Sequence, residues 1–373
     1  MRPLSTINYI HKNKRKLLSN IIIIVVAICL VYVMECFVSS IAESIYSLDA
    51  TRFNYASVIV STESVPEIPS DIITSLKESE NVDTVVPVTV RQIVFSVPGS
   101  TTHAAVFSAN SENLSYLTDR FKIEVSDGRL PEDGLDEIAV DKSVAKNNNL
   151  KIGSKTSIDT SHNLDREYTV VGILDSDSHI SFVGSPTLQD NTLKYGETGY
   201  LVFPSGGHRE QMENEVSSLS SQGINVWTLS LYEKMYAKNN QTFQILDIMV
   251  ILAIIVMVVC LVCSKYAQYF SRKSEFGILS AIGYTHKEIN KRTSCEVIFT
   301  NLISYALGLI IAILISKVIM TALFDNVGGT GVYLYWKAAA LSLLAPALTA
   351  MFTLFPVNRL IKKIDAVSIV TRN

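Results

Sequence analysis

Cysteine is missing from the long middle part of this 373-residue chain. All five cysteines lie in or beside hydrophobic segments, and these are Cys29, Cys36, Cys260, Cys263 and Cys295. A middle region without cysteine has no disulfide framework, so it must fold around a hydrophobic core. The Cys-x-x-Cys pair at 260–263 stands in an apolar run without histidine or charged activators, which favours helix packing over redox or zinc chemistry.

Motifs of nucleotide hydrolysis, metal binding and acyl transfer are also missing. Residues 153–156 read Gly-Ser-Lys-Thr, but a phosphate-binding loop needs glycine, four residues and then Gly-Lys-Ser/Thr. The histidines show no HExxH or other ligand spacing, and residues 205–208 lack a Gly-x-Ser-x-Gly elbow. We therefore expect no catalytic residue, no metal site and no bound cofactor on this chain, and no ATP hydrolysis by it.

Neither sign of charge dominates the chain. The formal net charge is −3, and the sequence has no basic stripe with interleaved aromatic residues that would indicate nucleic-acid binding. Hydrophobic residues make up 48% and charged residues 18%, and the mean hydropathy of +0.28 is too apolar for an ordinary soluble protein. Because the apolar residues are gathered in long runs, we predict a membrane protein with a soluble middle region.

The amino-terminal part predicts a surface helix followed by a membrane span. Residues 1–17 place apolar side chains on one helical face and end in a basic cluster, which is typical of a cytoplasmic interfacial helix. Residues 18–42 are long enough to cross a hydrocarbon core about 30 Å thick. Signal-peptide cleavage between Ser39 and Ala42 is an alternative, but the length of the run favours a retained anchor. Glu35 lies toward the outer end of this span, where we expect solvation or helix packing.

Residues 43–235 predict a soluble α+β domain. Short β-rich runs alternate with helical pieces and are separated by Pro, Gly, Asn and Asp. The β-rich runs include 56–60, 82–90, 92–97 and 168–174, and the helical pieces include 69–79 and 209–220. A domain of this length can bury its own core.

A helical pattern runs without a break from Leu229 to Ala267 and contains a second span. Residues 236–267 are assigned to the end of a stalk and to this span. The helical extension of the first span, near residues 45–48, is predicted to complete the stalk. A rigid stalk would carry movement between membrane and domain, whereas a flexible linker would absorb it.

A third span is predicted at 296–320 and a fourth at 337–356. The third span carries Ser304, Gly308 and Ala312 at four-residue intervals. Such a face of small residues allows close helix packing, either within the chain or against a second copy of a permease.

The distribution of basic residues predicts the topology. Segments 268–295 and 357–373 are basic, whereas the connection 321–336 has no Lys or Arg. By the positive-inside rule, both termini and segment 268–295 face the cytoplasm, and the large domain lies outside. We expect a multi-pass protein of the bacterial cell membrane, surrounded by the lipid bilayer.

Segment 268–295 predicts a short amphipathic helix on the membrane surface. Phe276, Leu279 and Ile282 recur at helical spacing with charged residues on the other side. Gly283 is a natural helix-stop residue. A helix held between two spans can pass a push from a cytoplasmic partner to those spans.

A family resemblance rests on this segment and on the middle region. The pattern Arg272-x-x-Glu275-x-Gly277-Ile278-Leu279-x-Ala281-x-Gly283 resembles the cytoplasmic coupling segment of the FtsX-like/MacB-like ABC transporter permeases. Four middle motifs resemble that family's extracytoplasmic domain in order and spacing, and they are Gly128-Arg129, Glu137-x-Ala139-Val140, Gly153-x-Lys155 and Tyr168-x-Val170-Val171-Gly172-Ile173. The tail is similar at Pro356 and Arg359, but Ala366 stands where proline is common.

The resemblance implies a non-catalytic permease subunit of the type VII, mechanotransmission class. It implies that two permeases, identical or paralogous, pair with two ATPase subunits, and that ATP and Mg²⁺ bind to the ATPases. The residues expected to form the ATPase-coupling surface are Arg272, Glu275, Phe276, Gly277, Leu279 and Gly283. Among them, Arg272 and Glu275 would offer charges to the ATPase.

The expected function is export or extraction of a substrate such as a peptide, an antibiotic or a lipid. An alternative interpretation is an FtsX-like signalling subunit that activates a cell-wall hydrolase or senses a ligand. Family members that activate hydrolases usually have a smaller outer domain, which favours transport. A membrane-anchored enzyme is a third interpretation, but no stretch of the sequence supplies its site.

Overall fold

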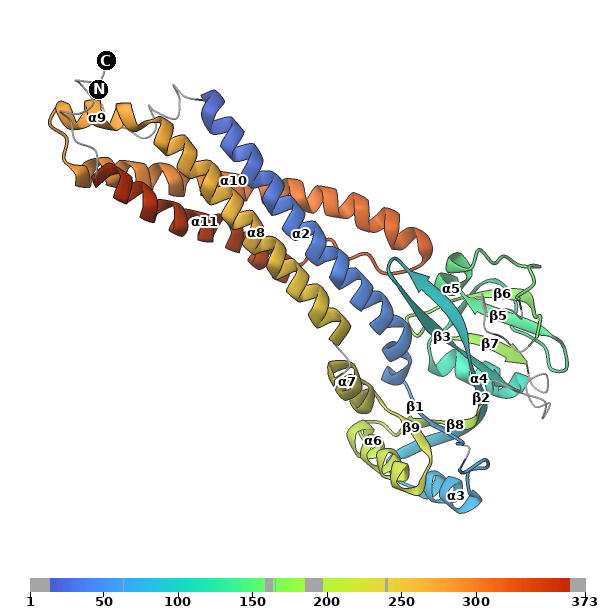
Figure 1. Cartoon of the computed structure of the whole chain (residues 1–373). Helices are drawn as coiled ribbons and strands as arrows, with labels where there is room; N and C mark the ends of the chain where they lie inside the picture. The colour runs from blue at the N-terminus through green and yellow to red at the C-terminus, as the bar shows by residue number, and fades with distance from the viewer. Residues whose placement is uncertain are drawn as a thin grey trace. The chain divides into compact units, whose positions relative to one another are not determined.

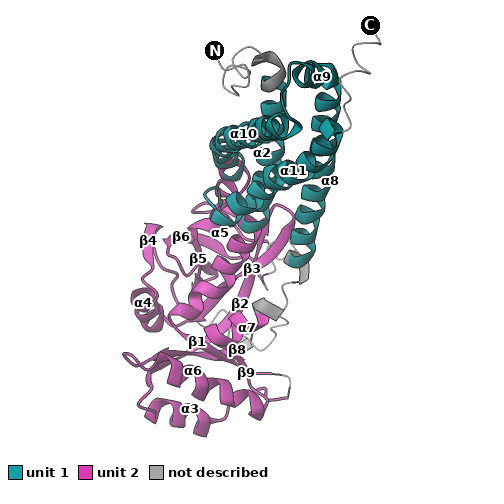
Figure 2. Ribbon diagram, turned by 90° about the vertical axis from the view of Figure 1, so that its left-hand side faces the viewer, with its two compact units in different colours: residues 1–39, 243–320, 332–373 teal, residues 40–242, 321–331 magenta. Residues whose placement is uncertain are grey.

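The computed structural model describes residues 14–62, 64–157, 164, 166–184, 197–238 and 241–362. The chain divides into two compact units, which Figure 2 colours separately. The helical unit comprises Met1–Ser39, Phe243–Met320 and Val332–Asn373, and the α/β domain comprises Ser40–Thr242 and Thr321–Gly331. Most of the surface helix expected at 1–17 and most of the tail at 357–373 lie outside the described residues.

The helical unit is built from long apolar helices (Figure 1). Their bounds are α2 Lys14–Ala50, α8 Gln241–Ser271, α10 His286–Leu323 and α11 Trp336–Lys362, with the short α9 Lys273–Ala281 between α8 and α10. In the part of the chain that the structure describes, four helices are long and apolar enough to cross a membrane, so the prediction of four membrane helices is confirmed by length and composition. The shortest of them, α11, has 27 residues and extends about 40 Å.

The small residues of α10 pack against α2 of the same chain. Ser304, Gly308 and Ala312 are all buried. A Cβ atom added at Gly308 would lie 3.0 Å from Ile28 Cδ1, so the glycine lets α2 approach closely. Cys29 Sγ also donates to the carbonyl oxygen of Gly308 at 3.7 Å. The neighbour of this face, left open by the sequence, is therefore the first helix.

Of the two accounts expected for Glu35, the structure shows helix packing and not solvation. Its side chain is fully buried in the helical unit, and Lys337 Nζ lies 2.8 Å from Glu35 Oε1. The same Nζ lies 3.2 Å from Asp247 Oδ1. Because an isolated carboxylate is costly in an apolar setting, the lysine of α11 compensates the acid of α2.

The α/β domain contains a sheet of nine strands among its described residues (Figure 1). The strands are β1 Ser57–Val60, β2 Val82–Val97, β3 Ser100–Ala109, β4 Glu124–Gly128, β5 Glu137–Asp141, β6 Thr169–Asp175, β7 Ser181–Gly184, β8 Glu197–Pro204 and β9 Asn225–Trp227. Their order in the sheet is β4-β6-β5-β7-β3-β2-β8-β1-β9, mostly antiparallel, with parallel pairs β3–β7 and β5–β6. The helices are α3 Ser70–Glu78, α4 Ser111–Arg120, α5 Lys142–Asn147, α6 Arg209–Ser218 and α7 Leu229–Lys238, with short 3₁₀ turns at Thr51–Asn54 and Leu219–Gln222. The predicted α+β class is confirmed.

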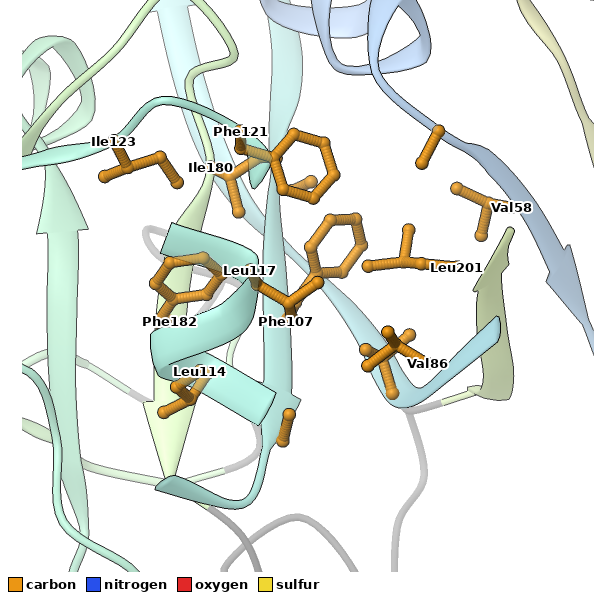
Figure 3. Packing of buried hydrophobic residues seen from close by; sticks show 14 of the residues in the cluster. Val58, Val86, Phe107, Leu114, Leu117, Phe121, Ile123, Ile180, Phe182 and Leu201 are labelled. Carbon is orange, nitrogen blue, oxygen red and sulfur yellow. The ribbon is translucent and has the colours of Figure 1, made fainter. Parts of the chain in front are cut away.

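The core of this domain forms where α4 covers the centre of the sheet (Figure 3). Leu114 and Leu117 of α4 are fully buried there together with Phe107 of β3 and Phe182 of β7. The ring of Phe121, just after α4, meets the ring of Phe203 edge-on at 5.5 Å. A second cluster lies between the sheet and α3 and α6. These contacts supply the hydrophobic core that the absence of cysteine requires.

The motifs that carried the resemblance meet in one part of the sheet. Arg129 Nη2 lies 2.6 Å from Glu137 Oε1, and Nη1 donates to Oε2 at 2.7 Å, so the two motifs share a two-pronged ion pair. Gly128 has φ +76°, and an added Cβ would lie 2.1 Å from the carbonyl oxygen of Val171. The amide of Gly153 donates to the carbonyl oxygen of Val170. Four weak sequence signals are thus parts of one folded piece.

Two helices cover the region from 229 to 267, where the sequence predicts one unbroken helix. They are α7, which ends at Lys238, and α8, which begins at Gln241. Residues 239 and 240, where continuity would be decided, lie outside the described part of the chain. The helical extension expected near 45–48 is present, because α2 continues to Ala50.

Candidate functional site: the segment between α8 and α10

The chain turns sharply on both sides of α9. Arg272 has φ −94° and ψ 12°, which ends α8 and starts α9. After α9, Gly283 takes φ +104°, a conformation that favours glycine, and Tyr284 donates from its amide to the carbonyl of Leu279. Thr285 and Glu288 then cap the next helix reciprocally, with the Thr285 amide 2.9 Å from Glu288 Oε2. These local signals fix α9 as a separate short helix between two long ones.

Arg272 joins the three helices through carboxylates. Its Nε lies 2.9 Å from Glu275 Oε2 on α9, and its Nη1 lies 2.8 Å from Glu296 Oε1 on α10. The guanidinium also lies over the rings of Tyr269 and Phe276, 5.3 Å from each centroid. Arg292 of α10 adds a longer contact of 3.5 Å to Glu275. We call this set of ion pairs the arginine network.

The arginine network is mostly hidden from solvent. The side chain of Arg272 is 12% exposed, and that of Glu296 is 5% exposed. Burial alone would lower the pKa of Arg272, but the hydrogen bonds and charges of Glu275 and Glu296 outweigh it and raise the pKa above the ordinary arginine value. Arg272 therefore stays charged, and its guanidinium is bonded to carboxylates of its own chain.

One side of α9 packs inward. Phe276 is 2% exposed and belongs to a cluster with Ile289, Val297, Val357 and other residues of α10 and α11. Gly277 is buried beside it, and Leu279 is half-buried against the same cluster. These three residues, which are predicted to belong to the coupling surface, lie on the side of α9 that packs against α10 and α11.

The other side of α9 presents isoleucines. Ile278 is 58% exposed and Ile282 is 69% exposed, with Ala281 and Gly283 exposed next to them. The expectation that Ile282 shares one helical face with Phe276 is wrong, because α9 ends at Ala281 and the chain turns at Ile282. We call Ile278, Ala281 and Ile282 the isoleucine patch. Exposed aliphatic side chains that lie side by side are suited to bind an apolar surface of a partner or of a membrane.

The sequence pattern predicted a short helix between two long ones, but it did not predict which residues of that helix are exposed. Of the six expected coupling residues, Gly283 is exposed, and Arg272, Glu275 and Leu279 are intermediate. The isoleucine patch was missed because its residues stand inside the same motif as the buried ones. Only contacts with α10 and α11 distinguish the two sides.

The α/β domain offers a second, more open feature. A depression of about 660 Å³ on α3 is lined by hydroxyl and carboxylate side chains, which belong to Ser70, Asp71, Thr74, Ser75, Glu78, Ser79 and Glu215. Glu215 already accepts a hydrogen bond from Ser79 at 2.8 Å. Among the described residues, no group of His, Cys, Asp and Glu could hold a metal ion. The depression therefore gives no chemical indication of a substrate.

Two family models match the chain. Residues 17–219 match the MacB-like periplasmic core domain, which is more than half of the chain. Residues 248–366 match the FtsX-like permease C-terminal model, and this match contains the whole of α9. No curated protein matches the chain.

Solved structures of similar domains were also found. The periplasmic region of MacB from Actinobacillus actinomycetemcomitans is 14% identical, with 53% of this chain and 97% of that chain covered and a TM-score of 0.31. The extracellular domain of the noncanonic ABC-type transporter YknZ from Gram-positive bacteria is 16% identical, with 46% and 95% covered and a TM-score of 0.30. On the two family models, the chain belongs to the MacB-like, FtsX-like family of ABC transporter permeases.

Proposed function

We propose that this chain couples ATP hydrolysis by a separate ATPase subunit to movement of its α/β domain outside the bacterial cell membrane. ATP and Mg²⁺ would bind to the ATPase, and a second permease, identical or paralogous, would complete the assembly. The moved substrate would be a peptide, an antibiotic or a lipid. In the alternative role, the same coupling step would drive a cell-wall hydrolase or report a bound ligand.

The observation that carries this proposal is the two-sided construction of α9. Its inner side is fixed by Phe276 and the arginine network, while Ile278 and Ile282 are left exposed. A partner that binds the isoleucine patch would push on a helix that is tied directly to α8 and α10. Ion pairs among buried groups resist deformation better than a flexible loop would, so a push on α9 would reach the membrane helices.

This assignment changes the role we propose for the charged residues. Arg272 and Glu275 satisfy each other inside the chain, so they position α9 and do not supply free charges to the ATPase. The docking energy would come from the isoleucine patch, because burial of an isoleucine contributes about 1.5 to 3 kcal/mol.

The test is co-purification of the full chain with co-expressed candidate ABC ATPases in nanodiscs, followed by measurement of ATP hydrolysis. Ile278→Glu combined with Ile282→Glu should reduce the recovered ATPase at least about tenfold, since two buried aliphatic contacts are lost. Ile152→Glu is a matched control, because Ile152 is 44% exposed in the α/β domain. Glu275→Arg is a poorer test because it would also break the pairing with Arg272.

Recovery of ATPase and hydrolysis at the wild-type level by the double variant would exclude the patch as the docking surface. If the double variant instead loses membrane association of α9, detected by fluorescence of a label attached through Ser274→Cys in a chain whose own cysteines are replaced, the isoleucines would contact lipid. Thermal unfolding of both variants in detergent checks that the chain is still folded.

A further inference from the structure

The connection between α10 and α11 belongs structurally to the α/β domain. Residues Thr321–Gly331 group with that domain and not with the helices that they join (Figure 2). This connection contains a short 3₁₀ turn, η3 at Asp325–Val327, that accepts hydrogen bonds from α5, and α5 in turn bonds Ser96 near the end of β2. A loop that only linked two membrane helices would not need such contacts.

Asn147, at the end of α5, is the centre of these contacts. Its Nδ2 donates to the carbonyl oxygen of Val327 at 2.8 Å and to that of Ser96 at 2.6 Å. The amide of Ser96 donates back to Asn147 Oδ1 at 2.8 Å. One amide side chain thus uses both its donor and its acceptor to join the connection to the end of β2.

Further contacts surround Asn147. Lys146 Nζ donates to the carbonyl oxygen of Asp325. Gly328 has φ +81°, and a Cβ added there would lie 2.3 Å from the carbonyl oxygen of Ser143, so only glycine allows the close approach to α5. The amide of Thr330 donates to Ser44 Oγ at 2.9 Å. We call residues 324–331 with these partners the α5 clasp.

The clasp lies at the end of a helix that starts in the coupling segment. α10 is one helix of 38 residues, from His286 to Leu323, and it would be about 57 Å long. Glu296, near the start of α10, forms an ion pair with Arg272 in the arginine network. A continuous helix transmits displacement along its axis, whereas a flexible linker of the same length would absorb it.

We propose that the α5 clasp is a third mechanical attachment of the α/β domain, in addition to α2 and to α7 with α8. In this arrangement α10 delivers movement of the coupling segment directly to α5 and to the β2–β3 hairpin, and Asn147 is the positioning residue. The source of that movement rests on the proposed function. The attachment itself is a property of this chain alone.

The first experiment needs no ATPase and uses hydrogen exchange of the full chain in nanodiscs. Asn147→Asp keeps the acceptor for the Ser96 amide but removes the donor to the carbonyl oxygens of Val327 and Ser96, so exchange of amides 324–331 should rise roughly tenfold. Gly328→Ala acts from the opposite side, and it should raise exchange in α5 and at 96–100 by a similar factor. Asn149→Asp is the control, because Asn149 is exposed two residues away and carries the same chemical change.

A reciprocal effect is the result that the attachment requires, because coupling between two elements acts in both directions. The proposal fails if a variant in α5 raises hydrogen exchange only in α5, or if Gly328→Ala raises it only in residues 324–331. The clasp would then be a passive contact. Lys146→Met removes only the bond to Asp325 and is the milder variant should Asn147→Asp fail to fold.

The second experiment adds a co-purified ATPase and compares exchange with and without ATP. In the wild type, ATP should change exchange in α5. In Asn147→Asp this change should be lost, while ATPase recovery and the exchange of 276–289 remain as in the wild type. Retention of the change in α5 would overturn the role in transmission. Failure of any ATPase to bind would reject the proposed function and leave the first experiment to decide the attachment.

Discussion

Arg272 and Arg129 make similar bonds in very different places. Both guanidinium groups hold carboxylates at hydrogen-bonding distance, Arg272 with Glu275 and Glu296, and Arg129 with Glu137. The side chain of Arg272 is 12% exposed, whereas that of Arg129 is 46% exposed. Glu296 is 5% exposed and Glu137 is 13% exposed, so water screens the Arg129–Glu137 pair more than the Arg272–Glu296 pair, and similar geometry should contribute unequally to stability.

Loss of Arg272 should have the largest effect. Arg272→Ala leaves Glu296 buried without its guanidinium, and breaking such a pair typically costs about 3 to 5 kcal/mol. We expect a lower midpoint of thermal unfolding for the full chain in detergent, and loss of protection from hydrogen exchange in α9. Arg272→Lys is the matched control, because it keeps the charge but cannot bond both acids in a fork, and its loss should be smaller. An unchanged midpoint in Arg272→Ala would mean that Arg292 or water replaces the lost group.

Gly128 should be the next most sensitive position, and it tests backbone geometry beside Arg129. Gly128→Ala adds a Cβ that would lie 2.1 Å from the carbonyl oxygen of Val171, at a φ of +76°. A side chain in such a conformation costs about 1 to 3 kcal/mol, before the clash is relieved. Gly134 offers a control, since it also has positive φ but a Cβ there meets no atom within 4 Å. If Gly134→Ala destabilises the full chain as much as Gly128→Ala, the clash with β6 contributes nothing.

The sequence predicted the large features because they depend on long patterns. Four apolar runs, each as long as a membrane is thick, required four membrane helices. The short β-rich runs of the middle region, which are separated by turn-forming residues, predicted a sheet with its own core. These signals come from many residues, so no single contact could override them.

The inner and outer sides of α9 could not be predicted in the same way. Phe276 and Ile278 are two residues apart and equally apolar, and both stand in the motif that carried the resemblance. Phe276 is buried because Val297 and Val357, distant in sequence, pack on it. Likewise, the resemblance implied that Arg272 offers its charge to the ATPase, and the sequence alone does not show that Arg272 bonds Glu296, 24 residues away. Long-range contacts decide which face of a short helix is free.

The smallest expected effect is the pH dependence of the exposed pair. Hydrogen bonds from Arg129 lower the pKa of Glu137 below its ordinary value of 4.5, and they outweigh partial burial, which raises it. A carboxyl whose pKa is lower in the folded state stabilises the fold fully above its unfolded pKa, and the contribution is lost as pH falls through the folded pKa. Glu137→Gln should therefore unfold a few degrees below the wild type at pH 7, and this difference should shrink as the pH falls below about 4.5.

Thermal unfolding of the full chain in detergent, measured from pH 7 to pH 3, would follow that difference. The unfolding midpoint of Arg129→Lys should lie between those of the wild type and Glu137→Gln. Lysine keeps a charge near Glu137 but cannot make the two parallel hydrogen bonds. The arginine network sharpens the comparison, since Glu296→Gln, at a side chain 5% exposed, should lower the midpoint more than Glu137→Gln, at a side chain 13% exposed. Equal shifts for the two variants would mean that solvent screening does not distinguish the two arginines, and the argument from burial would fail at its simplest point.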